Sequence, residues 1–154
     1  MYDGFDFEEY LKTSVSKLTH YCAAIVGMSD AEDAAQEAYI RLWRNLHRIP
    51  NEAAANVFLY RTAYRLSVDM LRKRKRSHPP EPEVHSAQAM SDTMVRALMS
   101  LSPSDRAILY SRVVDECEYS EIAARFSKNE AWARKRYSLA KKKMEKILGK
   151  DVKE

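Results

Sequence analysis

Hydrophobic residues recur at every third or fourth position along almost the whole chain, and no segment alternates with a period of two over the length of a strand. A spacing of three and four places side chains on one face of an α-helix. The pattern therefore predicts an all-α protein. The first predicted helix has its apolar positions at Phe7, Leu11, Val15, Leu18, Cys22 and Ile25.

Residues typical of helix ends mark the second predicted helix. Gly27 follows the first helix, at the position where glycine commonly ends one. Ser29 and Glu32 have the spacing of a capping box, so a second helix is predicted to begin there and to stop before Pro50. Its apolar positions are Ala31, Ala35, Ala38, Tyr39, Leu42, Trp43 and Leu46.

A third helix is predicted from about residue 56 to residue 76, after the connection IPNEAAAN (residues 49–56). Residues 77–91, SHPPEPEVHSAQAMS, contain three prolines and few apolar residues, which indicates a flexible linker. The sequence thus predicts two small helical domains, residues 1–76 and 92–154. The apolar side of the third helix is expected to carry Val57, Tyr60, Tyr64, Ser67, Val68 and Leu71.

The second domain has helix-start signals of its own. Ser102 is predicted as an N-cap, with Pro103 at the first helical position and Asp105 two residues further on. Residues 119–126 form a short predicted helix, and the connection SKN separates it from a long helix over residues 130–148. The helix that opens this domain has apolar residues at Met94, Val95, Leu98 and Leu101.

Two helices so close in sequence must pack their apolar faces together. On the first of them, Ile122 and Phe126 are one turn apart, and the small residue Ala123 allows the helices to cross closely. This is the pattern of a helix-turn-helix, whose second helix enters the major groove of DNA. The matching stripe on the second helix is Ala133, Tyr137, Ala140, Met144 and Ile147.

Cations cover the opposite side of that long helix. Lys135 and Lys142 oppose the stripe, with Arg134 and Arg136 on the flanks, and such side chains can pair with phosphates or guanine edges. A solvated face without function is the alternative, which the helix-turn-helix context disfavours. For Trp132, packing on the preceding helix and contact with a base or sugar both stay open. The predicted DNA-contacting set is Lys128, Asn129, Glu130, Trp132, Arg134, Lys135, Arg136 and Lys142.

A second basic run, LRKRKR (residues 71–76), ends the third helix. Upstream of it, tyrosines alternate with arginines at Tyr60, Arg61, Tyr64 and Arg65, a combination that can stack on unpaired bases while the cations hold phosphates. A solubilising helix end is the alternative for the basic run. Two such contacts joined by a linker would bind with a high effective concentration.

Charge is distributed unevenly along the chain. The net charge is +4, but residues 1–37 contain two lysines against eight Asp and Glu, which leaves about −6 there and about +10 on the rest. The asymmetry suggests a basic or polar partner for the front of the chain and a polyanion for the remainder.

Several function classes find no support in the sequence. The four histidines have no metal-ligand spacing and no nucleophile–base set is present, so neither a metal, a cofactor nor an enzymatic activity is expected. Cys22 and Cys117 are far apart and are expected to be reduced, partly buried thiols. No apolar run approaches the roughly 18 residues of a membrane span, and the acidic N-terminus lacks a signal sequence. A cytoplasmic protein without membrane insertion is predicted.

Residues 29–43, SDAEDAAQEAYIRLW, followed by residues 56–76, NVFLYRTAYRLSVDMLRKRKR, resemble region 2 of bacterial extracytoplasmic-function sigma factors. Residues 98–148 resemble region 4 of the same family. The resemblance covers nearly the whole chain in the right order. It implies a promoter-specificity subunit that also assists promoter melting, with core RNA polymerase, promoter DNA and an anti-sigma factor as partners.

The resemblance also implies roles for particular residues. The helix from Glu130 would read the −35 element, the loop over residues 47–55 would capture a flipped base of the −10 element, and the third helix would hold the −10 DNA. The −10 set is then Asn51, Asn56, Tyr60, Arg61, Tyr64, Arg65, Arg72, Lys73, Arg74, Lys75 and Arg76. The set expected to dock on the clamp helices of the polymerase is Asp33, Gln36, Glu37, Ile40, Arg41 and Trp43.

Two departures from the family pattern concern the helix-turn-helix. Ser127 stands where the family often has glycine, and Ala133 replaces a larger aliphatic residue, so Trp132 is expected to fill part of that space. Two other functions are alternatives: a sigma-like decoy that binds an anti-sigma factor without acting on DNA, and a simple helix-turn-helix regulator. The cations in both halves argue against the decoy, and the regulator leaves the first half unexplained.

Overall fold

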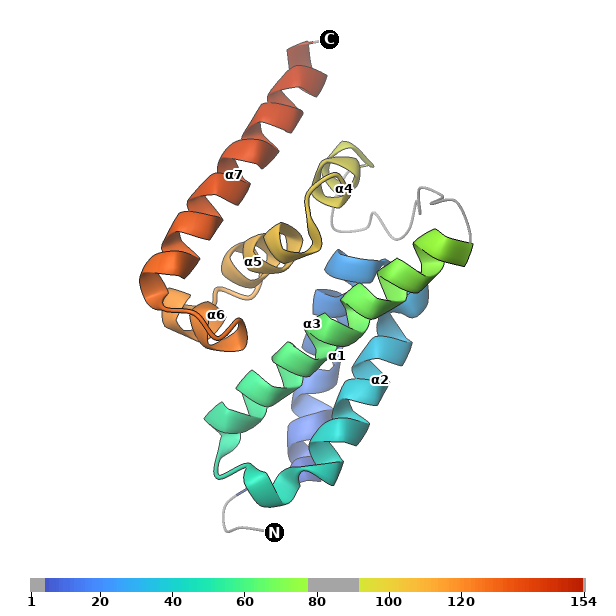
Figure 1. Cartoon of the computed structure of the whole chain (residues 1–154), viewed down its shortest axis with the longest axis vertical. Helices are drawn as coiled ribbons and strands as arrows, with labels where there is room; N and C mark the ends of the chain where they lie inside the picture. The colour runs from blue at the N-terminus through green and yellow to red at the C-terminus, as the bar shows by residue number, and fades with distance from the viewer. Residues whose placement is uncertain (1–4, 78–91, 154) are drawn as a thin grey trace. The chain divides into compact units, whose positions relative to one another are not determined.

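The chain is built of helices in two compact units, each of which is described by itself. A computed structural model describes residues 5–77 and 92–153, and no strand occurs among them, which confirms the all-α prediction for these residues (Figure 1). The chain divides between Lys73 and Arg74. Of the predicted linker, residues 77–91, only Ser77 is described, and it is the last residue of a helix.

Helices α1, α2 and α3 build the first unit, coloured from blue to green in Figure 1. Gly27 alone joins α1 to α2, with φ of 93°, a conformation that glycine adopts without steric cost. As predicted, this glycine ends the first helix and lets the chain reverse. The elements are α1 (Phe7–Val26), α2 (Met28–Arg44), the short 3-10 helix η1 (Leu46–Arg48) and α3 (Glu52–Ser77).

The core of the first unit combines small residues on α2 with large ones on its neighbours. Short alanine side chains bring helix axes close together, so α1 and α2 pack tightly along their length. Tyr21 of α1 also lies against Tyr60 of α3, with 4.8 Å between ring centroids. The buried set includes Leu18, Tyr21, Cys22 and Ile25 of α1, Ala31, Ala34, Ala35, Ala38 and Leu42 of α2, and Ala55, Leu59, Ala63 and Leu66 of α3.

Both ends of α2 differ from the prediction. The expected capping box of Ser29 and Glu32 is wrong, because Gly27 is the N-cap residue and no side chain caps the helix. α2 also ends at Arg44, well before Pro50, since the chain tightens into η1. Residues typical of helix ends therefore indicated roughly where α2 begins and ends, but not its exact first and last residues.

α3 begins four residues earlier than predicted. Asn51 provides the N-cap, and its Oδ1 accepts a hydrogen bond from the backbone N–H of Ala54 at 2.8 Å. Residues 52–55 consequently form the first turn of α3 rather than part of the predicted loop over residues 47–55. The connection that remains between η1 and α3 is only three residues long.

Two buried faces are rotated relative to the prediction. In α1, Val15 is exposed and Tyr10 is buried, because Tyr10 packs against the rings of Phe5 and Tyr39 at 5.3 and 6.4 Å between centroids. In α3, several alanine and leucine residues outside the predicted apolar side are buried in the core. Tyr60 and Ser67 are buried as predicted, whereas Val57, Tyr64, Val68 and Leu71 are only half-buried.

Helices α4 to α7 of the second unit follow the residues that are not described. Ser102 caps α5 as predicted: its Oγ accepts the backbone N–H of Asp105 at 3.2 Å, and Pro103 is the first helical residue. A capping box of Glu118 and Glu121 starts α6, which the sequence analysis missed. The elements are α4 (Asp92–Met99), α5 (Pro103–Val113), α6 (Tyr119–Arg125) and α7 (Glu130–Lys153), so α7 extends five residues beyond its predicted end.

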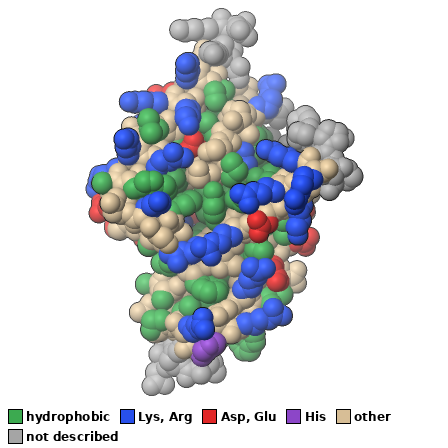
Figure 2. Space-filling model, in the orientation of Figure 1, with side chains coloured by type: hydrophobic (Ala, Val, Ile, Leu, Met, Phe, Trp, Pro, Cys, Tyr) green, Lys and Arg blue, Asp and Glu red, His purple; other side chains and the backbone are tan. Residues whose placement is uncertain are grey.

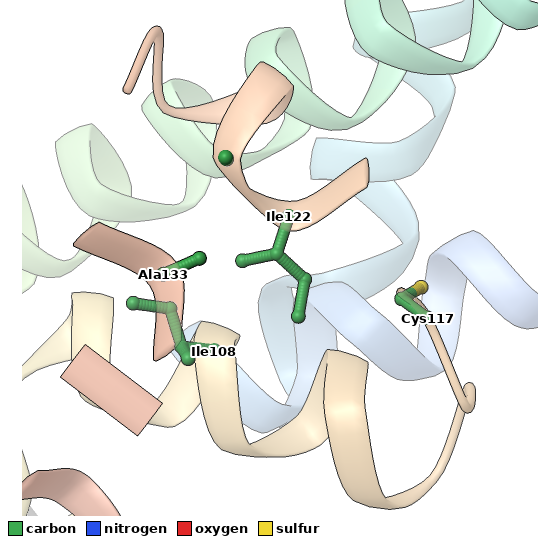
Figure 3. Packing of buried hydrophobic residues seen from close by; sticks show 5 residues of the cluster. Ile108, Cys117, Ile122 and Ala133 are labelled. Atoms are coloured by element: carbon green, nitrogen blue, oxygen red, sulfur yellow. The ribbon is translucent and has the colours of Figure 1, made fainter. Parts of the chain in front are cut away.

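A small apolar cluster joins α5, α6 and α7. Ile108, Ile122 and Ala133, from the three helices, are fully buried and point toward one another in Figure 3. Ala123 lies in the same cluster, so the predicted close crossing of α6 and α7 through small residues is confirmed. Cys117, two residues before α6, belongs to the same cluster.

Both cysteines are buried free thiols, as predicted. Burial raises the pKa of Cys22 to about 11, an effect that the neighbouring Ser67 hydroxyl partly offsets. The pKa of Cys117 is also raised, again mainly by burial. Because the thiolate is the reactive form, these thiols are placed for packing rather than for chemistry.

Candidate DNA and polymerase interfaces

The turn between α6 and α7 fixes where the long helix starts. Ser127 has φ of 57° and donates its N–H to the Ala124 carbonyl at 3.2 Å, while Lys128 donates to Ala123 at 2.9 Å. These two bonds form a Schellman motif, in which glycine is the usual residue at the position of Ser127. Asn129 then caps α7, its Oδ1 accepting the N–H of Trp132 at 2.8 Å. Asn129 was predicted to contact DNA, but its side-chain oxygen is occupied by this hydrogen bond within the protein.

Most of the predicted cations of α7 are exposed. Lys135 and Lys142 project from the side opposite to the buried residues Ala133 and Ala140, and Lys128 is exposed in the turn before the helix. A row of exposed cations on a rigid helix suits the phosphates and base edges of a groove.

Two further predicted contacts, Glu130 and Arg134, are bound to each other. Their charged atoms lie 2.7 Å apart, and the guanidinium carbon of Arg134 is 4.7 Å from the ring centroid of Tyr119. Both side chains are more than half exposed, so the pair lies at the surface near the start of α7.

Arg136 does not project like the other cations. Its Nη2 donates to Asp105 Oδ1 at 3.0 Å and lies 3.3 Å from Ser104 Oγ, both on α5. Lys143 donates to the other carboxylate oxygen of Asp105 at 3.1 Å. Arg136 was predicted as a DNA contact, but in the structure its guanidinium joins α7 to α5.

Trp132 packs on the preceding helix. Its ring centroid lies 5.5 Å from that of Phe126, and it packs against the buried cluster that includes Ala133. Lys128 Nζ and Arg136 Cζ each lie 6.0 Å from the ring centroid of Trp132. Of the two roles left open for this residue, packing is the one that the structure shows.

The predicted −10 face of α3 divides into buried and exposed residues. Tyr60 is only 5% exposed and packs on Tyr21, so stacking of its ring on a base is wrong for this conformation. Asn56 accepts a hydrogen bond from the Tyr10 hydroxyl, and Asn51 caps the helix. These polar residues therefore shape the start of α3.

The remaining −10 residues of α3 reach the surface to different degrees. Arg61, Tyr64 and Arg74 are half-buried. Arg72 lies 3.9 Å from Asp69 in an exposed ion pair. The exposed members of the set are Arg65, Arg72, Lys73, Lys75 and Arg76.

A mixed apolar and charged surface lies along α2. Trp43 is 60% exposed although its ring packs edge-to-face with that of Phe7, with 5.1 Å between the centroids, and Ile40 is also exposed. Glu37 and Arg41 form an ion pair of 3.6 Å beside them. An exposed aromatic among charged groups is typical of a protein-binding surface. The other residues predicted for this surface, Asp33 and Gln36, are exposed as well.

Lys and Arg side chains are more numerous than Asp and Glu on the face drawn in Figure 2, which agrees with the positive charge of the chain after residue 37. Within residues 5–77 and 92–153, no helix is both long and apolar enough to cross a membrane. No three His, Cys, Asp or Glu residues of these ranges are grouped to hold a metal ion.

Sequence reasoning missed three interactions that organise these surfaces, namely those of Asp105 with Arg136 and with Lys143, and that of Tyr10 with Asn56. From the sequence, Asp105 stood out only for its place in the first turn of α5. The pairs are separated by 31, 38 and 46 residues, so no local spacing marks them.

Comparison with known proteins identifies both halves. The family model for Sigma-70 region 2 matches residues 6–77, and the model for Sigma-70, region 4 matches residues 91–144. The chain is 24% identical to the ECF RNA polymerase sigma factor SigW of Bacillus subtilis (strain 168), over 75% of this chain and 74% of SigW.

A solved structure has the same fold. It is the sigma factor RpoE in complex with the anti-sigma factor NepR from Bartonella quintana, with a TM-score of 0.79, 19% identity, and coverage of 94% of this chain and 97% of that chain. The two family models lie in the predicted order and together span most of the chain. The chain therefore belongs to the RNA polymerase sigma factors of the extracytoplasmic-function type.

Proposed function

We propose that α7 reads the −35 element of promoters through the exposed face that carries Lys135 and Lys142. The observation that supports this proposal is the geometry of the helix-turn-helix. Ala133 and Ala140 face inward, and the cap at Asn129 fixes the first turn, so the lysines are displayed on a rigid surface. A helix presented in this way fits the major groove.

We propose that α3 and the short turn before it hold the −10 element and help to open it. Arg65 and the basic run at the end of the helix, residues 72–76, supply cations, and the half-buried Tyr64 offers an aromatic ring beside them. Tyr60 is left out of this proposal, because its side chain is buried. Asn51 and Asn56 contribute by setting the shape of the turn.

The polymerase-binding role belongs to α2 in this proposal. Trp43 and Ile40 supply apolar contact, and Asp33, Gln36 and the Glu37–Arg41 pair surround them with polar groups. Interfaces commonly combine one aromatic anchor with a polar rim in this way. The site suits the clamp helices of the largest polymerase subunit, as the resemblance implies.

An anti-sigma factor is a further proposed partner, because the structurally similar RpoE is in complex with one. As a subunit of RNA polymerase, the protein would act in the cytoplasm. Its role there would be that of a transcription regulator rather than an enzyme.

The proposal is tested by in vitro transcription from genomic fragments with core polymerase, with and without this protein. New discrete transcripts are expected, and their start sites would reveal the −10 and −35 sequences. Lys135→Ala should lower transcription from these promoters about tenfold, the scale of a single interaction with a base edge. Lys146→Ala, an exposed lysine near the far end of α7, is the matched control. Absence of transcripts together with absence of co-elution with core polymerase would contradict the proposal.

A further inference from the structure

We propose that Asp105 is a positioning residue for promoter recognition, which holds α7 in the pose that reads DNA by binding Arg136 and Lys143. The proposal rests on the role of α7 in reading the −35 element. Asp105 itself lies on α5 and is too deeply buried to touch DNA.

The Asp105 carboxylate binds two cations of α7 at once, and we call Asp105 with Arg136 and Lys143 the Asp105 clamp. Its side chain is 2% exposed, and its two oxygens are divided between the two cations, with Oδ1 bound to Arg136 at 3.0 Å and Oδ2 to Lys143 at 3.1 Å. The side chains of Arg136 and Lys143 are 35% and 59% exposed, so each runs from the surface of α7 down to the carboxylate.

The spacing of the two cations determines which movement of α7 the Asp105 clamp restrains. Arg136 and Lys143 are two helical turns apart, about 10 Å along the axis of α7. They therefore reach Asp105 from opposite directions along the helix, and a slide of α7 either way would lengthen one of the two bonds. Ala140 lies between them in sequence and is fully buried.

Electrostatic attraction favours the arrangement in which both cations are bound to Asp105. A buried carboxylate is costly unless it is paired, so Asp105 favours conformations in which both cations stay on it. The N-terminal turn of α5 adds a favourable dipole, and the backbone N–H of Asp105 donates to the Ser102 cap. Because Arg136 and Lys143 are paired with Asp105 inside the protein, they are not expected to bind phosphates of DNA.

The proposal predicts that loss of the Asp105 carboxylate affects specific and non-specific DNA binding differently. Reading base edges requires that α7 be held in one pose, whereas attraction to phosphates depends mainly on the number of cations. Without the clamp, recognition of the −35 sequence should thus weaken while general attraction to DNA is kept or increased.

The first test uses holoenzyme made with the full-length protein and with Asp105→Asn. The measured quantity is the ratio of affinities for a promoter with its native −35 element and one with a scrambled −35 element, both with the same −10 element. Asp105→Asn is expected to lower this ratio about tenfold, the equivalent of one base-edge interaction. Glu145→Gln removes a carboxylate from the exposed surface of α7 and should leave the ratio unchanged.

A second variant covers the case in which Asp105→Asn fails to fold, which its thermal unfolding would reveal. Arg136→Gln changes a partly exposed side chain, and it should lower the same ratio without changing the slope of log affinity against log salt. If Arg136 instead held a phosphate, this slope would decrease by about 0.9. Such a decrease would overturn the proposal.

The outcomes distinguish this inference from the proposed function. If the unaltered holoenzyme ignores the −35 sequence, the role of α7 fails, and the positioning role fails with it. If the unaltered holoenzyme discriminates and both variants discriminate equally well, only the role of Asp105 is overturned.

Discussion

Ser127 has a left-handed backbone conformation that suits glycine better than serine. Ser127→Gly should therefore raise the free energy of unfolding of the second unit, by about 0.5–1 kcal/mol. Urea denaturation followed by circular dichroism measures this change. Ser138→Gly is the matched control, because the same substitution in the middle of α7 should lower stability by about 0.5 kcal/mol. Equal effects of the two substitutions would contradict the role assigned to the turn.

The two buried thiols predict slow chemistry. Since the raised pKa values of Cys22 and Cys117 leave little thiolate near neutral pH, both should react slowly with a thiol reagent in the folded protein. Unfolding in denaturant should increase the rate by at least about tenfold, because it restores a pKa near 8.5 and access to the sulfur. The reaction is followed by absorbance at pH 8. Rapid modification of the folded protein would disprove the burial of these residues.

At the scale of the element, α2 makes the clearest prediction about the polymerase. Trp43→Ala should weaken binding of core polymerase about tenfold or more, since exposed aromatic anchors carry much of the energy of an interface. Asp33→Ala should weaken it less. Both variants should leave binding of −35 duplex DNA by the protein unchanged.

Val15→Ala is the matched control for Trp43→Ala, since Val15 is an exposed apolar residue of the neighbouring helix α1. Affinities for core polymerase can be measured by fluorescence anisotropy of a labelled sigma factor. Wild-type affinity of the Trp43→Ala variant would place the polymerase interface elsewhere.

The helices themselves were predictable, because a period of three to four is visible wherever a helix buries one face. Their ends and faces were less so. α2 starts with a glycine N-cap in place of a capping box, and α3 starts early because Asn51 caps it. In α3, two neighbouring faces carry apolar residues, and only the packing within the first unit decides that Leu59 and Ala63 are buried while Val57 is half-buried.

At the scale of the whole molecule, the positive charge after residue 37 predicts DNA binding that weakens steeply with salt. Replacing the basic run, residues 72–76, by glutamine should reduce the salt slope for duplex DNA by up to about 0.9 for each phosphate that is no longer neutralised. Replacing Lys12 and Lys17 of α1 is the control and should leave the slope unchanged. Anisotropy titrations at several salt concentrations measure both. An unchanged slope in the first variant would assign the run to solubility alone.

The candidate surfaces were predictable in composition but not in detail. Their cations stand out as clusters in the sequence, which is why Lys135 and the run over residues 72–76 were found. Burial and pairing depend on residues far along the chain, so the sequence placed Tyr60 both on the apolar side of α3 and among the −10 residues, and it did not reveal that Arg136 is bound to Asp105. Long-range partners thus decide which members of a basic cluster face the solvent.

The link between Asp105 and the cations of α7 bears on attempts to reprogram promoter choice. A recognition helix transplanted from a related sigma factor would bring new base-reading residues, but it would fit this scaffold only if it kept a cation at both positions 136 and 143. Loss of either cation would leave one oxygen of the buried carboxylate without its partner. The exchangeable module is therefore α5 together with α7, and libraries of altered promoter specificity should vary Lys135 and Lys142 while holding Asp105, Arg136 and Lys143 constant.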